Sequence, residues 1–337
     1  MTLRRGADFA VAGLVGEDQA AAIDRVAERY AVALTPLLAD LIDPTDADDP
    51  IARQFIADER ELAATEEELP DPIGDHAHAP LKGVVHRYPD RVLLTPLLHC
   101  PVYCRFCFRR ERVGGAEKAL SEAELQAALD YIATHPEIWE VVITGGDPLM
   151  LPPARLAALL QALEEIPHVQ VIRLHSRIPI ADPARIGDAL IAALSLQRAT
   201  LWLAVHCNHP RELSPDAAAA CRRLSFAGIP LLGQTVLLKG VNDRAETLED
   251  LFRAMVAHRI KPYYLHHLDL APGTGHFRTT IADGQDLMRT LRGRLSGICQ
   301  PTYVLDIPGG AGKVPVGPVY WQEGEVTDWQ GESHAYP

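Results

Sequence analysis

Three cysteines that lie close together along the chain carry the clearest chemistry. Cys100, Cys104 and Cys107 follow the spacing C-x3-C-x2-C, directly after an apolar run that predicts a buried strand. Three thiolates at this spacing can hold three irons of a [4Fe-4S] cluster and leave the fourth iron without a protein ligand. Because an electron carrier normally provides a ligand to every iron, an open iron indicates catalysis. A zinc site with His99 as the fourth ligand is the alternative.

A lysine near the end of the chain is the second candidate. Lys313 follows the glycine-rich residues 308–312, at the end of a strand predicted over residues 302–306. In a mostly apolar site its amine has a lowered pKa and can form a Schiff base with a carbonyl cofactor. An exposed lysine and a phosphate-binding loop are the alternatives, although Val314 stands where a Walker motif requires Ser or Thr.

The cysteine motif, with Phe106 just before its third cysteine, resembles the radical S-adenosylmethionine (AdoMet) superfamily. The turn Gly145-Gly146-Asp147 after the second predicted strand matches the glycine-glycine-acid motif of that superfamily. Two glycines let a backbone approach a ligand closely, although most such turns only reverse the chain. The resemblance implies that AdoMet binds the open iron of a [4Fe-4S] cluster beside Gly145, Gly146 and Asp147.

Together with Lys313, further motifs make the chain similar to the lysine 2,3-aminomutase family over about residues 70–335. These motifs occur in the order of the family: HRYPDR at 86–91, CFRR at 107–110, HCNHP at 206–210, GQTVLLKGVND at 233–243, PYY at 262–264, Asp269, HFR at 276–278 and DIPGGAGK at 306–313.

The resemblance implies pyridoxal phosphate (PLP) as a further cofactor, with Lys313 as the catalytic lysine that binds it. The remaining residues of the implied cofactor site are Arg87, Tyr88 and Arg91 near the phosphate, and His206 and Gln234 facing the cofactors. A planar guanidinium suits bidentate binding of a phosphate. Outside the family context, His206 would be interpreted as a hydrogen-bonded core histidine.

The family also implies how a substrate is held. Arg109 corresponds to the arginine that binds the α-carboxylate, and Asp269 and Asp306 to the aspartates that bind the ε-ammonium group of lysine. The implied function is an isomerase that converts L-lysine to β-lysine, with flavodoxin or ferredoxin as electron donor. Alternatives are an aminomutase for another amino acid, such as glutamate, and a non-catalytic iron-sulfur or zinc-binding barrel.

Some residues depart from the family pattern. Phe106 and His266 replace a histidine and a tyrosine of the clostridial-type members, and Arg244 stands where those members contribute a zinc ligand. The cysteine cluster that follows the PLP lysine in longer members is also missing, so their zinc and tetramer are not carried over. A homo-oligomer is still compatible with the sequence. The short form resembles the aminomutases that supply β-lysine for elongation factor P.

The elements that must position these residues alternate along the chain. Strands are predicted to begin near residues 92, 140, 170, 200, 230 and 262, with helices over 122–134, 154–165, 183–193, 215–227, 245–258 and 283–295. This α/β pattern predicts a parallel sheet, either curled or open, and the resemblance implies a partial (β/α)6 barrel.

This pattern divides the chain into three parts. Residues 1–85 form an N-terminal helical region, with helices around 19–39 and 50–68; residues 86–300 form the barrel; and residues 301–337 form a C-terminal segment with a seventh strand and the PLP lysine.

The composition excludes several classes of partner. The chain has 45 acidic and 32 basic residues, a net charge of −13, which disfavours nucleic acid and anionic membranes. No apolar run approaches the roughly 20 residues of a membrane span, so a cytoplasmic location is expected.

Overall fold

A computed structural model describes residues 1–115 and 119–337. Within these residues, nine strands form one sheet whose spatial order follows the chain. Strands β2 to β8 run parallel, and β1 and β9 pair antiparallel at the two edges. The strands are β1 Val84–Tyr88, β2 Arg91–Leu97, β3 Glu140–Gly145, β4 Val171–Ser176, β5 Thr200–His206, β6 Leu231–Val236, β7 Ile260–His266, β8 Thr302–Ile307 and β9 Gly312–Pro315.

The sheet curls until its two edge strands meet. The hydroxyl oxygen of Tyr88 on β1 accepts a hydrogen bond of 2.6 Å from the backbone nitrogen of Lys313 on β9. A Cβ atom added at Gly312 would lie 2.9 Å from the same oxygen, so a side chain at this position would push the edges apart. The prediction of a partial parallel barrel is therefore confirmed, and the open alternative is excluded.

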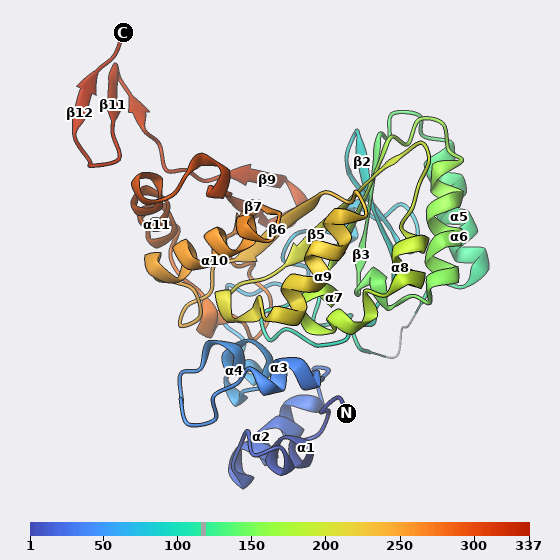
Figure 1. The fold of residues 1–337 in the computed structure, drawn as a ribbon, viewed down its shortest axis with the longest axis horizontal. Coiled ribbons are helices and arrows are strands. Elements are labelled where there is room, and N and C mark those ends of the chain that lie inside the picture. The colour runs from blue at the N-terminus through green and yellow to red at the C-terminus, as the bar shows by residue number, and fades with distance from the viewer. Residues whose placement is uncertain (116–118) are drawn as a thin grey trace.

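Helices cover the outer face of the barrel (Figure 1). They are α5 Glu122–Ala133, α6 Pro153–Glu164, α7 Ile178–Ala181, α8 Asp188–Ala193, α9 Pro215–Phe226, α10 Ala245–Ala257 and α11 Ile281–Arg294. Local sequence explains their bounds and orientation. Ser121 caps α5, and α10 buries Leu248, Leu251, Phe252 and Met255, which share one helical face.

The N-terminal region covers the end of the barrel from which the cysteine loop emerges (Figure 1). The Thr35 hydroxyl donates a hydrogen bond of 2.6 Å to the carbonyl of Ala181, and the backbone nitrogen of Tyr103 donates to the carbonyl of Ala33. The region comprises α1 Gly6–Val11, α2 Glu17–Ala27, α3 Pro36–Asp40, α4 Pro50–Phe55 and the 3-10 helices Glu59–Leu62 and His76–His78. It thus shields the cysteines from one side.

Three predicted helices were too long. The helix expected over 19–39 ends at Ala27, because Leu34 pairs with Leu3 in an antiparallel bridge before Pro36 begins α3. The helix expected over 50–68 ends at Phe55. The helix expected over 183–193 starts as the 3-10 turn Pro183–Arg185 and becomes α-helical only after Gly187.

Both edge strands were absent from the sequence prediction. Strand β1 spans the proposed boundary at residues 85 and 86, and β8 and β9 add the beginning of the C-terminal segment to the barrel sheet. The rest of that segment forms a separate small sheet of β10 Trp321–Gln322, β11 Glu325–Thr327 and β12 Ser333–Ala335. The three-part division therefore stays a proposal. No helix of the described chain has the length and apolar character needed to cross a membrane.

Candidate active site

A cavity of about 550 Å³ lies within the curled sheet. Every residue that the sequence analysis assigns to a cluster, cofactor or substrate lines this cavity. They are Arg87, Tyr88, Arg91, Cys100, Cys104, Cys107, Arg109, Gly145, Gly146, Asp147, His206, Gln234, Asp269, Asp306 and Lys313. The fold thus brings together side chains that are more than 200 positions apart in the sequence.

The three cysteines of the loop after β2 are free thiols beside the cavity. Burial raises the pKa of all three, that of Cys104 to about 11, so their thiolates need a compensating positive charge. His99, the candidate fourth ligand of the zinc alternative, bonds through Nδ1 to the Tyr103 hydroxyl at 3.1 Å. The three thiols are thus available to bind irons of a cluster, as their spacing predicts.

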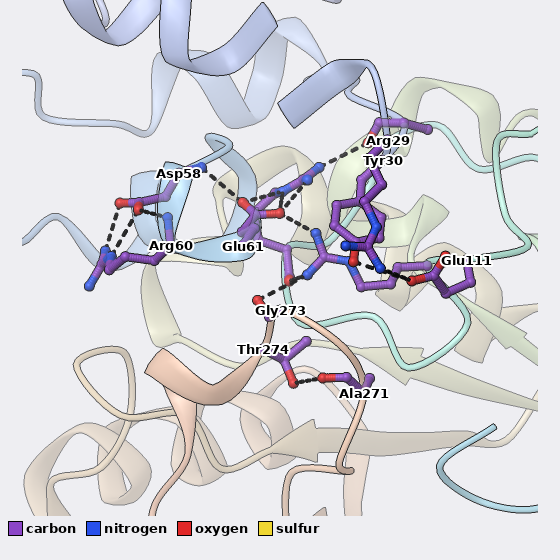
Figure 2. Close-up of polar contacts among 12 residues, drawn as sticks. Arg29, Tyr30, Asp58, Arg60, Glu61, Glu111, Ala271, Gly273 and Thr274 are labelled. Carbon is purple, nitrogen blue, oxygen red and sulfur yellow. Dashed lines mark hydrogen bonds and ion pairs between the residues drawn. The ribbon is translucent and has the colours of Figure 1, made fainter. Parts of the chain in front are cut away.

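A buried ion-pair network supports the cysteine loop. The Glu61 carboxylate binds the guanidinium groups of Arg105 and Arg110, which flank Cys107. Burial opposes the charge of Glu61, but the two arginines outweigh it and lower its pKa. Figure 2 shows Glu61, which is part of the N-terminal region, near the segment of Gly273, whose carbonyl accepts a 3.3 Å bond from Arg110. The sequence analysis missed Glu61 because it lies among many exposed acidic residues.

The turn at Gly145-Gly146-Asp147 packs against the cysteine loop. A Cβ atom at Gly146 would lie 2.4 Å from the backbone nitrogen of His99, and Gly145 has a φ of +100°. The Asp147 carboxylate accepts hydrogen bonds from the Ser176 hydroxyl at 2.8 Å and from the Arg177 nitrogen at 2.7 Å. Burial raises the pKa of Asp147 to about 6 despite these bonds. The glycines thus permit a close approach of the chain to itself, and Asp147 braces the loop after β4.

Lys313 lies on strand β9, directly after the glycine-rich turn that the sequence predicts. It is the register partner of Asp306 on β8, and its ammonium group forms an ion pair with the Asp306 carboxylate. His266 Nδ1 lies 3.2 Å from the same nitrogen. Although burial opposes ionisation, His266 and Lys313 lower the pKa of Asp306 to about 2. Burial and the Lys313 charge lower the pKa of His266 to about 4.

Asp269 contributes a second carboxylate to this end of the cavity. Its Oδ1 atom is buried and has no hydrogen-bond partner. Burial, followed by the negative charge of Asp306, raises the pKa of Asp269 to about 7. A cationic ligand in the cavity would satisfy this oxygen and stabilise the ionised carboxylate.

Arginines line another part of the cavity. Arg87 and Arg109 both bind the carboxylate of Asp75, at 3.0 and 2.9 Å. The Arg91 guanidinium lies over the ring of Tyr88, 3.7 Å from its centroid. Asp75 was missed by the sequence analysis, since no motif includes it.

Two histidines face the cavity from neighbouring strands. His206 on β5 is the register partner of Gln234 on β6. The ring centroids of His175, on β4, and His206 are 5.7 Å apart. The Nε2 atoms of both rings are buried without a hydrogen-bond partner. Burial lowers the pKa of His206 to about 3, so both rings are neutral at physiological pH.

Several other lining residues were given no role in the sequence analysis, although Tyr263, Tyr264 and His266 were named there. Most lie on strands, where alternation of inward and outward side chains was the available signal: Thr144, Arg173, His175, Arg177, Tyr263, Tyr264 and His266.

Two family models match this chain, and several known proteins are similar to it. The radical SAM superfamily model matches residues 94–253, and a model described as lysine-2,3-aminomutase matches residues 288–324. L-lysine 2,3-aminomutase of Clostridium subterminale is 40% identical over 289 residues, which cover 86% of this chain and 69% of that protein. L-lysine 2,3-aminomutase of Escherichia coli (strain K12) is 36% identical, with 85% and 83% covered. Glutamate 2,3-aminomutase of Clostridioides difficile (strain 630) is 38% identical, with 88% and 70% covered.

Proposed function

From the premise that this chain belongs to the lysine 2,3-aminomutase family of the radical SAM superfamily, we propose that it converts L-lysine to β-lysine. The family makes the chain an isomerase of the aminomutase type. The substrate and the roles of individual residues belong to the proposal.

The side chains around the cavity fit three cofactors. Cys100, Cys104 and Cys107 would hold a [4Fe-4S] cluster, and the turn at Gly145, Gly146 and Asp147 would offer backbone groups to AdoMet. PLP would bind at the other end of the cavity. The residues that would hold PLP are Lys313, Arg87, Tyr88 and Arg91, with His206 and Gln234 alongside.

The cofactors, when bound, supply radical initiation and a carbonyl group that binds an amine reversibly. The protein supplies orientation and exclusion of water. Arg109 orients an amino acid through its carboxylate, while Lys313 provides the primary amine that an incoming amine displaces. The cavity lies within the curled sheet, which limits the contact of reactive species with solvent. An electron donor such as flavodoxin or ferredoxin would reduce the cluster.

The observation that carries the choice of substrate is the unpartnered carboxylate oxygen of Asp269 in a cavity that also contains Asp306. Asp306 already binds a primary ammonium group, that of Lys313. The two carboxylates and the Arg109 guanidinium, which line the same cavity, match the ε-ammonium and α-carboxylate of lysine. The same carboxylates repel the γ-carboxylate of glutamate.

The alternative substrate is glutamate, because a relative with 38% identity is named glutamate 2,3-aminomutase. The two proposals are separated by assaying L-lysine, L-glutamate, L-arginine and L-ornithine with the reconstituted enzyme under reducing, anaerobic conditions. We expect the highest kcat/KM for L-lysine. Faster turnover of glutamate than of lysine would refute the lysine assignment while leaving the family membership intact.

A further inference from the structure

Asp75 lies between two arginines that have different proposed partners. Its Oδ1 atom is 3.0 Å from Nη2 of Arg87, at the proposed phosphate site. Its Oδ2 atom is 2.9 Å from Nη2 and 3.3 Å from Nε of Arg109, at the proposed α-carboxylate site. The Asp75 side chain is 6% exposed, so water competes little for these contacts.

The contacts of Arg109 leave a specific edge of its guanidinium group available. The group has five N–H donors. Asp75 accepts from Nε and Nη2, and the Thr144 hydroxyl oxygen accepts from Nη1 at 3.4 Å. One hydrogen on each terminal nitrogen is left, and donors on both terminal nitrogens can bind a carboxylate through two hydrogen bonds.

The segment that carries Asp75 is itself held in place. We call residues 71–78 the strap. Within the strap, the Asp71 carboxylate accepts hydrogen bonds from the backbone nitrogens of Asp75 at 2.9 Å and His76 at 2.8 Å. Asp71 therefore fixes the backbone from which the Asp75 side chain extends.

The strap is also fastened to the turn that precedes Lys313. His78 Nε2 bonds to the carbonyl oxygen of Gly310 at 3.0 Å. A Cβ atom at Gly74, which has a φ of +69°, would lie 2.3 Å from the Gly310 nitrogen. The position of Asp75 thus depends on the same turn that sets the position of Lys313.

We propose that Asp75 is a positioning residue, which orients the Arg109 guanidinium so that its free edge receives the α-carboxylate of the substrate. One carboxylate between two guanidinium groups leaves a net charge of about +1, which still attracts an anion. The inference rests on the proposed function only in assigning the α-carboxylate to Arg109. It does not depend on which amino acid is bound.

A double-mutant cycle tests this inference. The proteins are the wild type, Asp75→Asn, Arg109→Ala and the double variant, each loaded with PLP and assayed without reductant so that no turnover occurs. Isothermal calorimetry measures the dissociation constants of L-lysine and of 1,5-diaminopentane, which lacks the carboxylate. Asp75→Glu serves as the conservative variant, and Glu67→Gln is the matched control because Glu67 is an exposed acidic residue of the same N-terminal region.

We expect Asp75→Asn to weaken L-lysine binding roughly ten- to hundredfold and to leave 1,5-diaminopentane binding unchanged. The double variant should bind L-lysine no more weakly than Arg109→Ala, because Asp75 acts through Arg109. Asp75→Glu should recover part of the affinity, and under turnover Asp75→Asn should raise KM more than it lowers kcat.

Additive effects in the cycle, or equal weakening of both ligands, would show that Asp75 only maintains the fold and would overturn the inference. Unchanged L-lysine affinity in Asp75→Asn would overturn it as well. If the wild type binds glutamate in place of lysine, the substrate proposal fails. The cycle is then decided with glutamate, which has the same α-carboxylate.

Discussion

The end of the cavity at the cysteine loop (the cysteine end) and the end at Lys313, Asp306 and Asp269 (the lysine end) differ in how their buried carboxylates are satisfied. At the cysteine end, Glu61 pairs with Arg105 and Arg110, and the Asp147 carboxylate accepts hydrogen bonds from the loop after β4. Nε of Arg110 is the exception in this network, since it is buried without a partner. At the lysine end, Asp269 Oδ1 and His266 Nε2 are buried without hydrogen-bond partners.

This difference distinguishes groups that hold the backbone in place from groups that would bind a ligand. A buried polar group without a partner is costly, so native proteins seldom retain one unless something else binds it. Groups with partners at the cysteine end hold the backbone that carries the thiols. Groups without partners at the lysine end mark where a polar ligand would be bound.

The largest expected effects come from removing the reactive group at either end. Cys104→Ala should abolish activity and prevent assembly of a cluster of about four irons, but should leave the PLP absorption band in place. Lys313→Ala should also abolish activity. This variant should lose the PLP absorption band and keep the cluster, because only a primary amine binds PLP covalently. Iron and sulfide analysis and absorption spectra after anaerobic reconstitution measure both.

Cys221→Ala is the matched control, since Cys221 is buried in the barrel core away from the cavity. It should assemble a normal cluster. Loss of the cluster in this variant, or borohydride trapping of PLP on another lysine, would contradict the assignment of the two ends.

The next largest effect concerns the lysine end. Asp269→Asn removes the carboxylate that has an unpartnered oxygen and should lower kcat/KM for L-lysine by roughly two to four orders of magnitude. Steady-state kinetics with the reconstituted enzyme measure the loss. If the variant instead loses thermal stability and retains normal kinetics in its folded fraction, Asp269 braces a loop and binds no substrate.

At the cysteine end, substitution of a buried carboxylate should lower the stability of the protein. Glu61→Gln leaves the charges of Arg105 and Arg110 buried without an anion and should lower the free energy of unfolding by about 3–5 kcal/mol. Urea denaturation measures this change. Glu59→Gln is the control, because the ion pair of Glu59 with Arg25 is exposed and should contribute at most about 1 kcal/mol. Similar losses in both variants would remove the distinction between framework and surface charge.

Local sequence predicted the residues whose chemistry depends on close spacing. The three cysteines and the glycine-rich segment before Lys313 lie within short motifs, and the alternation of strands and helices predicted the barrel. The lengths of the N-terminal helices were wrong because long-range contacts end them. Leu34, for example, pairs with Leu3 in a bridge that helical periodicity does not reveal.

The residues that support the site were harder to predict. Glu61 reaches Arg105 across 44 positions, and His78 contacts Gly310 across 232. Neither pairing leaves a pattern in the sequence, since an acidic residue that becomes buried is the same letter as one that stays exposed. Asp75 was missed for the same reason, although it binds two residues that the motifs identified.

The smallest expected effect is a pH dependence that arises at the lysine end. Burial and the charge of Asp306 raise the pKa of Asp269 to about 7, so this carboxyl is mostly neutral below pH 7 and ionised above it. A substrate ammonium binds the ionised form, and kcat/KM for L-lysine should therefore fall about tenfold for each pH unit below 7. Asp306 and His266, whose pKa values are about 2 and 4, do not change charge in this range. Asp147, with a pKa of about 6, also changes charge near this range, so the test compares pH profiles of the wild type and Asp269→Asn. The variant should lose the decline that begins near pH 7, and an unchanged profile would assign the decline to Asp147 or another group at the cysteine end.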